Sequence, residues 1–461
     1  MPEREIDSYY FLNDDEREVE KFVGIEAFAT YKIRGIKGEY KKIYKDFIVK
    51  EILNNGKILD IKEDNKDTQF SKELKDRYTT FNLIKINRDT FDAIREISKI
   101  LKISSDQIYY SGLKDKFSIS VQKVSIKGDH TENLRKVKIQ DVFIRNVLPT
   151  KKPVKLGSHW GNHFTIVLRN IENRKNFESK IEKYVSFLTK IGFPNYFGLQ
   201  RFGNFRPNSH IVGRCLLERN FKKAYEELVL KTYSTESIES REARRELRES
   251  GNLEKAFNEF HKSLNYERKI IQYLIENPDD YEGSINILSA DLKRLLISSF
   301  QSYIFNKLLS KRIEEGIPLF KPMKGDVISI LDDFNGNITQ VKYIYGNHYD
   351  NFLKKALNMN RAAIVIPLVG ANTNLDDFPF MRLFFEKILR EEHIDKDIFN
   401  MHLNSEQEFK GSIRPIVVKP TGLKILEIAD DDFNPGKKKM KFEFSLQKGS
   451  YATMLIREFI K

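Results

Sequence analysis

The sequence predicts an α+β protein with more than one domain. Strand-like runs stand next to one another in some regions and between helical stretches in others, which argues against a doubly wound parallel sheet. The chain has 461 residues, too many for one simple core, so two or three domains are expected. Its composition, 40% hydrophobic and 31% charged, is typical of a soluble globular protein.

The elements of the first half follow from apolar spacing. Residues 46–53 and 81–86 are short apolar runs with β-branched side chains and predict strands. Alternation within residues 163–169 predicts a half-buried strand. A helix is predicted after a cap at Asp89 or Thr90, because apolar residues then recur at helical spacing. Its predicted apolar stripe consists of Phe91, Ile94, Ile97, Ile100 and Leu101.

The second half mixes charged segments with apolar ones. Residues 235–262 are dense in Glu, Arg and Lys and predict exposed helix and loop. A long helix is predicted over 292–313, and the long interval before the last segment leaves room for an inserted domain. The other predicted elements are strands at 326–331 and 362–368, a helix at 376–391 and a final segment from Lys441. The stripe of the long helix consists of Leu292, Leu295, Leu296, Ser299, Phe300, Tyr303 and Ile304.

The charge balance makes nucleic acid the leading class of partner. Lys and Arg number 79 against 66 Asp and Glu, a formal net charge of +13, and cations placed against phosphates release counterions. The alternative is that many of these charges lie on solvated faces. Candidate phosphate contacts are Lys41, Lys42, Lys45, Lys50, Lys151, Lys152, Lys155 and Lys437–Lys439, each of which is equally consistent with an exposed loop.

Several classes of protein are disfavoured. The single cysteine, Cys215, excludes an intrachain disulfide and a zinc site of several thiolates, and suits a reducing cytosol. The N-terminus lacks the features of a secretory signal, and the apolar stretch 362–371 is too short for a membrane helix. No glycine-rich phosphate loop and no histidine pair with metal-ligand spacing is present, so neither a cofactor nor a metal is expected. These features predict a cytoplasmic protein.

Two polar clusters are candidates for chemistry. In the first, residues 109–122, Gly112 is expected to permit a tight turn, and Asp115 lies between Lys114 and Lys116. A carboxylate beside a cation, walled by apolar neighbours such as Leu113 and Phe117, can act as a nucleophile or base. The alternative is a surface turn whose Asp and Lys pair with each other.

The second cluster, residues 193–210, interleaves aromatic rings with amides and guanidinium groups. Such a set offers an extruded base a stacking surface and hydrogen-bond partners for its edge. An aromatic core loop with capping amides is the alternative. The polar members are Asn195, Gln200, Arg201, Asn204 and Arg206, and the aromatic members are Tyr196, Phe197, Phe202 and Phe205.

Together the clusters resemble the signatures of the TruD family of pseudouridine synthases. The matching stretches are SGLKDKFSISVQ (111–122), PNYFGLQRFG (194–203) and KGSYATMLIRE (448–458), with weaker matches beginning at Gly38, Gly161 and Ser298. The long spacing is similar to that of archaeal and eukaryotic members. The resemblance implies isomerisation of a uridine in tRNA, typically at position 13 in the D arm, without a cofactor. A monomer is the default expectation.

The resemblance also implies a domain plan. Residues 1–207 and 420–461 would form a pseudouridine-synthase-like catalytic domain, with a mixed, largely antiparallel sheet flanked by helices. Residues 208–419 would form an inserted α/β domain specific to the family, and the helix at 291–313 can pack on the catalytic domain.

Site residues carry over by position. Asp115 falls on the family's catalytic aspartate, Phe197 on the aromatic residue that stacks on the target base, and Asn195 on a neighbouring polar contact. Lys41 falls on a basic residue near the aspartate, although this chain reads Tyr-Lys-Asp-Phe at 44–47 where relatives often read Pro-Glu-Asp-Phe. Gln200 and Arg201 complete the predicted substrate contacts.

Two other functions use some of the same features. A non-catalytic RNA-binding protein would use the same basic and aromatic surface without needing Asp115. A metal-dependent nuclease would need several convergent carboxylates, and none has convincing spacing.

Overall fold

The computed structural model describes residues 16–64, 78–203, 205–332, 336–346, 348–400 and 409–461. The chain forms two compact units. The sheet unit comprises Thr30–Phe193 and Val418–Lys461, and the helix-rich unit comprises the residues up to Ala29 and Pro194–Val417. The boundaries at 207/208 and 419/420 concern the insertion expected for the family, which compactness alone does not define, so they stay a prediction.

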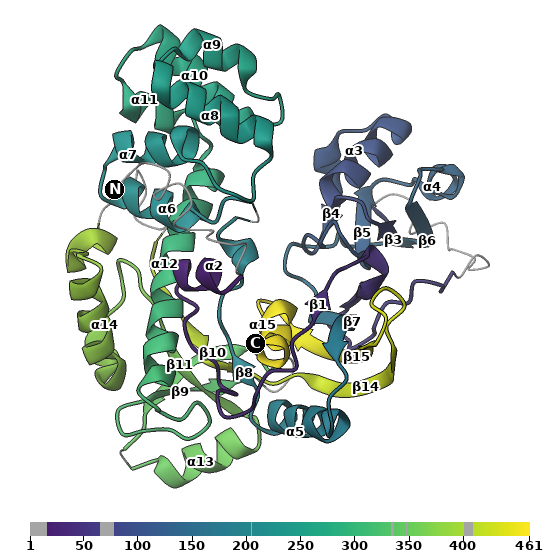
Figure 1. Cartoon of the computed structure of the whole chain (residues 1–461). Coiled ribbons are helices and arrows are strands. Elements are labelled where there is room, and N and C mark those ends of the chain that lie inside the picture. The colour runs from purple at the N-terminus through teal and green to yellow at the C-terminus, as the bar shows by residue number, and fades with distance from the viewer. Residues whose placement is uncertain (1–15, 65–77, 204, 333–335, 347, 401–408) are drawn as a thin grey trace. The chain divides into compact units, whose positions relative to one another are not determined.

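Among its described residues, the sheet unit contains a nine-stranded sheet (Figure 1). The main path runs β14-β15-β7-β2-β5-β3-β6, while β1 pairs with β7 and β4 with β5. All pairings are antiparallel except β2 with β5, which is parallel. The strands are β1 (Glu39–Tyr40), β2 (Phe47–Ile52), β3 (Tyr78–Ile86), β4 (Ile108–Tyr110), β5 (Ile119–Lys127), β6 (Val142–Thr150), β7 (Gly161–Glu172), β14 (Thr421–Asp430) and β15 (Lys437–Gln447).

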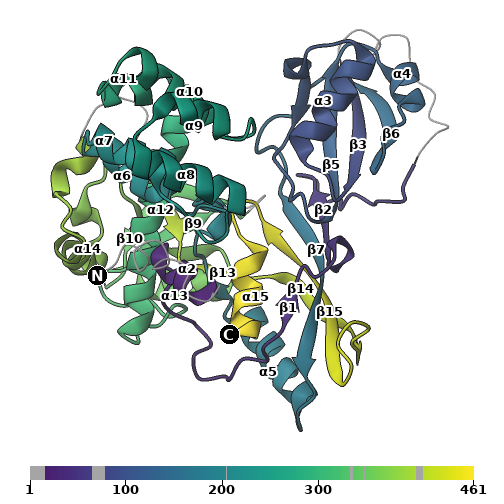
Figure 2. The ribbon, with the colours of Figure 1, turned by 45° about the horizontal axis from the view of Figure 1, so that its top comes forward.

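Four described helices flank this sheet. They are α3 (Thr90–Leu101), α4 (Thr131–Lys136), α5 (Phe177–Lys190) and α15 (Ala452–Ile460). In Figure 2, α3 lies beside β3 and β5. The Asp89 side chain caps α3 by accepting hydrogen bonds from the Phe91 and Asp92 N–H groups.

The buried face of α3 is narrower than predicted. Ile94 and Ile97 pack with Phe81 and other residues of the sheet in one core. Phe91 and Ile100 are about half exposed, at 51% and 49%. At 100° per residue, these two positions fall at the edges of the buried arc, so spacing alone overstated the stripe.

The helix-rich unit is built around α12 (Ala290–Glu314), which agrees with the predicted long helix. Leu296, Phe300 and Ile304 are buried as expected, but Leu295 is 47% exposed and lies outside the packed face. Its other helices are α2 (Glu16–Phe22), α6 (Ser209–Leu217), α7 (Phe221–Tyr225), α8 (Ile238–Ser250), α9 (Leu253–Glu259), α10 (Asn265–Glu276), α11 (Tyr281–Asn286), α13 (Asp350–Asn358) and α14 (Pro379–Glu391).

The charged segment 235–262 is more buried than predicted. It forms α8 and α9, and Leu247 and Ala256 contribute to the interior. Arg244 is fully buried, where it pairs with Glu236 and Glu267 and donates to the Leu228 carbonyl oxygen. A buried arginine of this kind breaks the hydrophobic pattern on which the prediction depended.

A second described sheet, β10-β9-β11-β12, lies in the helix-rich unit and is antiparallel throughout. Its strands are β9 (Val327–Leu331), β10 (Ile338–Ile344), β11 (Ala362–Leu368) and β12 (Ser412–Pro415). The chain passes from one unit to the other within two short strands, β8 (Phe193–Pro194) and β13 (Val417–Val418). The predicted α+β class with mixed, largely antiparallel sheets is confirmed.

Cys215 is buried, and this burial raises the pKa of its thiol to about 12. Within the described ranges, every helix is too short or too polar to cross a membrane.

Candidate active site

Asp115 lies in the loop between β4 and β5 of the sheet unit. Its Oδ2 accepts a hydrogen bond from Lys41 Nζ at 2.8 Å, although the two residues are 74 positions apart. Their side chains are 37% and 21% exposed, respectively. Lys41 has a left-handed backbone (φ 58°), and its Nζ lies 4.2 Å from the centre of the Phe47 ring. The structure therefore brings together the two residues that the motifs single out in this unit.

The backbone of Asp115 is fixed by two further donors. Lys85 Nζ donates to the Asp115 carbonyl oxygen at 2.6 Å, and Ser118 Oγ donates to the same oxygen at 2.7 Å. Lys85 is fully buried in β3. Burial lowers the pKa of Lys85 to about 8, and the negative charge of Asp115 opposes that shift. Sequence reasoning missed Lys85, because a lysine inside an apolar strand gives no separate signal.

A buried carboxylate organises the start of the same loop. Glu51 Oε2 accepts from Ser111 Oγ at 2.5 Å and from Lys114 Nζ at 2.9 Å, and Glu51 Oε1 accepts from the Lys123 N–H at 3.2 Å. The alternative that Asp115 pairs with an adjacent lysine is wrong for Lys114, whose ammonium group is committed to Glu51.

Two expectations about this loop are wrong. Leu113 and Phe117 are 55% and 39% exposed, so they do not wall off Asp115. Gly112 does not need to be glycine for its backbone, because its φ is not positive and an added Cβ would meet only His159 Cε1 at 3.7 Å. The contacts of Glu51, Lys85 and Ser118 hold the loop instead.

Phe197, in the helix-rich unit, is buried and held through its backbone. Asn306 Oδ1 accepts from the Phe197 N–H at 2.9 Å, and Asn306 Nδ2 donates to the Phe197 carbonyl oxygen at 3.0 Å. The ring packs edge-to-face against Phe305, with centroids 5.5 Å apart. The guanidinium carbon of Arg414 lies 3.9 Å from the ring centre of Phe197.

Arg414 also engages Asn195. It donates to Asn195 Oδ1 at 2.6 Å and to the Asn195 carbonyl oxygen at 3.0 Å, while Asn195 Nδ2 donates to the Pro415 carbonyl oxygen at 2.9 Å. Arg414 thus links two predicted residues, Asn195 and Phe197. It is isolated in the sequence, more than 200 positions away, so no local motif could have identified it.

The other predicted contacts of this cluster differ in exposure. Arg201 donates to Ser298 Oγ at 2.6 Å and to Ser302 Oγ at 3.2 Å, both on α12, and its guanidinium carbon lies 5.9 Å from the Phe197 ring centre. The Gln200 side chain is exposed. Asn204 lies outside the described residues. Asn195, Phe197, Gln200 and Arg201 belong to the helix-rich unit, whereas Asp115 and Lys41 belong to the sheet unit.

Several candidate phosphate contacts are engaged by carboxylates. Lys50 pairs with Asp60 at 3.4 Å, and Lys42 pairs with Glu39 at 3.5 Å. At the opposite end of the sequence, the pairs Lys438–Asp430 and Lys439–Asp432 both measure 2.8 Å. These lysines add less net positive potential than their number indicates.

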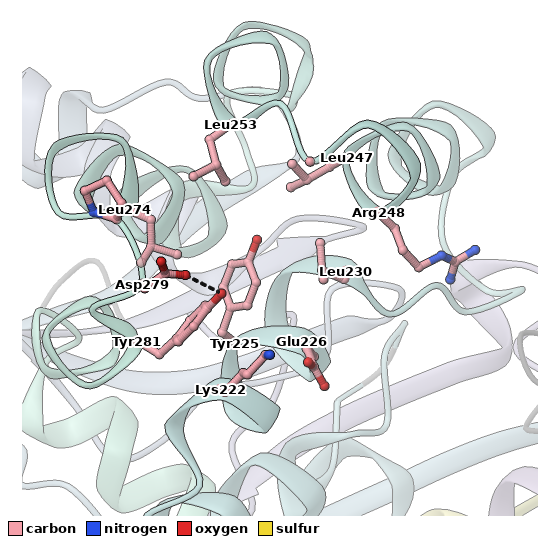
Figure 3. A pocket seen from close by; sticks show the side chains of 12 residues that line it. Lys222, Tyr225, Glu226, Leu230, Leu247, Arg248, Leu253, Leu274, Asp279 and Tyr281 are labelled. Atoms are coloured by element: carbon pink, nitrogen blue, oxygen red, sulfur yellow. Dashed lines mark hydrogen bonds between the residues drawn. The ribbon is translucent and has the colours of Figure 1, made fainter.

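A separate hollow of about 310 Å³ lies within the helix-rich unit (Figure 3). Its Tyr225 and Tyr281 rings have centroids 5.2 Å apart, and Tyr281 Oη donates to Asp279 Oδ1 at 3.5 Å. None of the predicted site residues lines this hollow. Within the described chain, no group of three or more His, Cys, Asp or Glu side chains is arranged to hold a metal ion.

Comparison with known proteins identifies the class. The family model described as tRNA pseudouridine synthase D (TruD) matches residues 22–459. A "Probable tRNA pseudouridine synthase D" of Methanosarcina mazei is 33% identical over 448 residues, which cover 96% of this chain and 98% of that protein. The corresponding protein of Methanosarcina acetivorans is also 33% identical, with 96% and 97% covered.

A solved structure agrees with these sequences. The crystal structure of the putative tRNA pseudouridine synthase D (TruD) from Methanosarcina mazei superposes with a TM-score of 0.76 at 32% identity, covering 96% of this chain and 98% of that chain. Fold and sequence together place the protein among the pseudouridine synthases, which are isomerases. Within that class, the chain belongs to the tRNA pseudouridine synthase D (TruD) family.

Proposed function

We propose that this protein converts one uridine of tRNA, at position 13 in the D arm, into pseudouridine, with Asp115 as the catalytic residue. The observation that carries the proposal is the pairing of the Asp115 carboxylate with Lys41 Nζ at 2.8 Å. Lys85 holds the backbone at this position by donating a hydrogen bond to the Asp115 carbonyl oxygen. Family membership supplies the class of reaction.

The reaction rearranges bonds without net oxidation or reduction. The N1–C1′ bond of uridine breaks, the uracil turns, and a C5–C1′ bond forms, while a proton leaves C5 and N1 gains one. Asp115 either attacks C1′ or removes the ribose 2′ proton. Both routes need a carboxylate oxygen that substrate can reach, and the Asp115 side chain is 37% exposed. Lys41 holds Oδ2, so Oδ1 is the oxygen that we assign to the substrate.

Phe197 is proposed to hold the uracil by stacking while the base turns. Its face toward Arg414 is covered at 3.9 Å, so stacking on that face requires the Arg414 side chain to move away. Asn195, Gln200 and Arg201 are proposed as contacts to the same nucleotide. Of these three, Gln200 has the most exposed side chain and needs no rearrangement to meet RNA.

The proposal includes the organisation and setting of the protein. Residues 208–419 are the proposed inserted domain, between catalytic segments 1–207 and 420–461. The enzyme is proposed to act as a cytoplasmic monomer without a cofactor. Size-exclusion chromatography with light scattering tests whether the enzyme is a monomer. Activity after exhaustive chelation and dialysis tests whether it acts without a cofactor.

The decisive test is Asp115→Asn, which keeps the size of the side chain and removes its charge. We expect pseudouridine formation in a tRNA transcript to fall by at least about 10³-fold, while binding of that transcript changes little. Asp106→Asn, a change of the same kind at an exposed aspartate of the same unit, serves as the control. Near-normal turnover by Asp115→Asn would refute the catalytic role.

A second arm tests the substrate. A transcript with U13 replaced by C is expected to give no pseudouridine. Pseudouridine at another position of that transcript would show that the enzyme modifies a different uridine. A non-catalytic RNA-binding protein would bind the transcript without forming product in any arm.

A further inference from the structure

The sheet unit contains a surface hollow of about 460 Å³ that the proposed chemistry does not use. It lies between residues 32–36 and the first turns of α5, and shares no residue with the Asp115 loop. Its lining includes six cationic side chains, namely Lys32, Arg34, Arg174, Lys175, Lys180 and Lys183.

The walls of this basic hollow are tied to the sheet unit. Tyr184 Oη donates to the Ile33 carbonyl oxygen at 2.9 Å, and the Ile36 N–H donates to the Phe459 carbonyl oxygen at 2.8 Å. Between them, Gly35 approaches the backbone so closely that a Cβ would lie 1.8 Å from the Lys461 carbonyl oxygen. The cations of residues 32–34 are therefore presented from an anchored segment rather than from a free loop.

The positive charge of the basic hollow is poorly compensated. Glu172 is the one acidic residue in its lining, and it pairs with Arg174. In the described part of the chain, no salt bridge to a carboxylate involves Lys32, Arg34, Lys175, Lys180 or Lys183. Glu178 and Glu182 also lie on α5 but do not line the hollow. Desolvation, followed by the charges of Arg174 and Arg34, lowers the pKa of Lys180.

This distribution differs from that of the lysines at 438–439 and at position 50. Lys438 and Lys439 are each paired with an aspartate, and Lys50 with Asp60. Cations that lack carboxylate partners retain more of their attraction for an external anion. Five such cations line the basic hollow, more than a single small anion requires, and this number fits a run of successive phosphates.

We propose that the basic hollow binds the phosphate backbone of the RNA substrate, away from the nucleotide that reacts. The inference rests on the proposed function, which makes RNA the substrate. Contacts of this kind position the RNA without reading its sequence. Their loss should therefore appear in KM and in the salt dependence of binding.

The first test neutralises two cations of the basic hollow, with Lys180→Gln and Lys183→Gln in one protein. The control protein carries Lys136→Gln and Lys190→Gln, which are exposed, lie outside the hollow and remove the same net charge. Lys190 is on the same helix, roughly 15 Å beyond Lys180. Binding of a tRNA transcript is measured over a salt series.

We expect the Lys180/Lys183 protein to bind severalfold more weakly at physiological salt, with a slope of log K against log salt reduced by about 2. The control should match the wild type. Equal affinity and equal slope in the two double variants would overturn the proposal. Should the wild type bind RNA but form no pseudouridine, the proposed function fails, while the binding comparison still decides the role of the hollow.

The second test locates RNA directly. Ser179→Cys places a thiol in the lining, and Ser186→Cys places one at an exposed position two turns further along α5, outside the lining. The one native cysteine is buried, so a photo-crosslinker reacts mainly with the introduced thiol. We expect tRNA to crosslink from position 179 and not from position 186, with loss at high salt. Equal crosslinking from both positions, or none from 179, would exclude RNA from the hollow.

Discussion

Replacing Lys41 tests whether this residue positions the Asp115 carboxylate or only helps to bind tRNA. Lys41→Gln removes the cation that holds Asp115 Oδ2 at 2.8 Å. We expect kcat to fall roughly 10²-fold because the carboxylate loses its fixed geometry. Lys42→Gln is the matched control, since Lys42 is exposed and pairs with Glu39 rather than with Asp115. An unchanged kcat for Lys41→Gln, measured at saturating tRNA, would show that Lys41 does not position the carboxylate.

Lys85 gives a prediction about pH. Its pKa is about 8 in the folded protein against an ordinary 10.5, because of burial. Between those values the unfolded chain holds more protons than the folded one, so stability should rise with pH across this window. The free energy of unfolding of the wild type, compared with that of Lys85→Met, should therefore rise by up to roughly 3 kcal/mol between pH values below 8 and above 10.5. Urea unfolding of both proteins at several pH values measures this, and a constant difference would contradict it.

The candidate site could be predicted only in part from single residues. Asp115 and Lys41 lie in recognisable stretches, and the structure brings them into contact. Glu51, Lys85 and Arg414 were not predicted, because each depends on a tertiary contact with residues far along the sequence. The apolar neighbours of Asp115 were misread, since hydrophobicity does not tell which way a loop side chain points.

Glu51 on β2 and Lys114 on the loop that carries Asp115 form a buried pair. Their side chains are 1% and 4% exposed. Glu51→Gln leaves the Lys114 ammonium buried without its counter-charge, which should cost about 3–5 kcal/mol. Adding Lys114→Met should restore much of the loss, as followed by urea unfolding. A double variant that is no more stable than Glu51→Gln alone would contradict this account.

The packing of α6 against α12 gives a second prediction. A Cβ at Gly213 would lie 2.1 Å from the Leu296 carbonyl oxygen on α12, so the helices approach each other through this glycine. Gly213→Ala should destabilise the protein by about 1–3 kcal/mol in thermal unfolding. Gly112→Ala, whose methyl group has room, should change stability by less than about 0.5 kcal/mol. Equal unfolding temperatures for the two variants would contradict the close approach.

Elements with strong apolar periodicity were predicted best. The helix at 292–313 and the strands at 326–331 and 362–368 appear close to their predicted bounds. The segment 235–262 was misread because its buried polar group, Arg244, is satisfied by Glu236 and Glu267. Periodicity reports apolar burial and misses burial that depends on ion pairs.

Arg169 joins the two stretches of chain, Thr30–Phe193 and Val418–Lys461, that make the sheet unit. It pairs with Asp46 at 2.8 Å and with Asp431 at 3.1 Å. Burial alone would raise the pKa of Asp431. Hydrogen bonds to its carboxylate outweigh the effect of burial and lower the pKa to about 2. The donors are the Asn170 N–H, the Asn434 side chain, the Phe433 N–H and Arg169.

Asp431 should therefore contribute to acid stability. Its contribution is present above the ordinary pKa and is lost as pH falls from about 4 through 2. Asp431→Asn should flatten the decline in unfolding temperature over this range. An identical acid profile for the variant and the wild type would show that the aspartate is not linked to folding.

The pairing of β7 with β15 along their length has a consequence for synthesis on the ribosome. About 265 residues separate Glu172 from Lys437, and translation at 5–20 residues per second needs roughly 10–50 s to make them. During that interval the nascent chain carries an unpaired edge on β7, the kind of edge that invites aggregation. We therefore expect that a chaperone or another part of the nascent chain shields this edge of β7 until β15 has been synthesised.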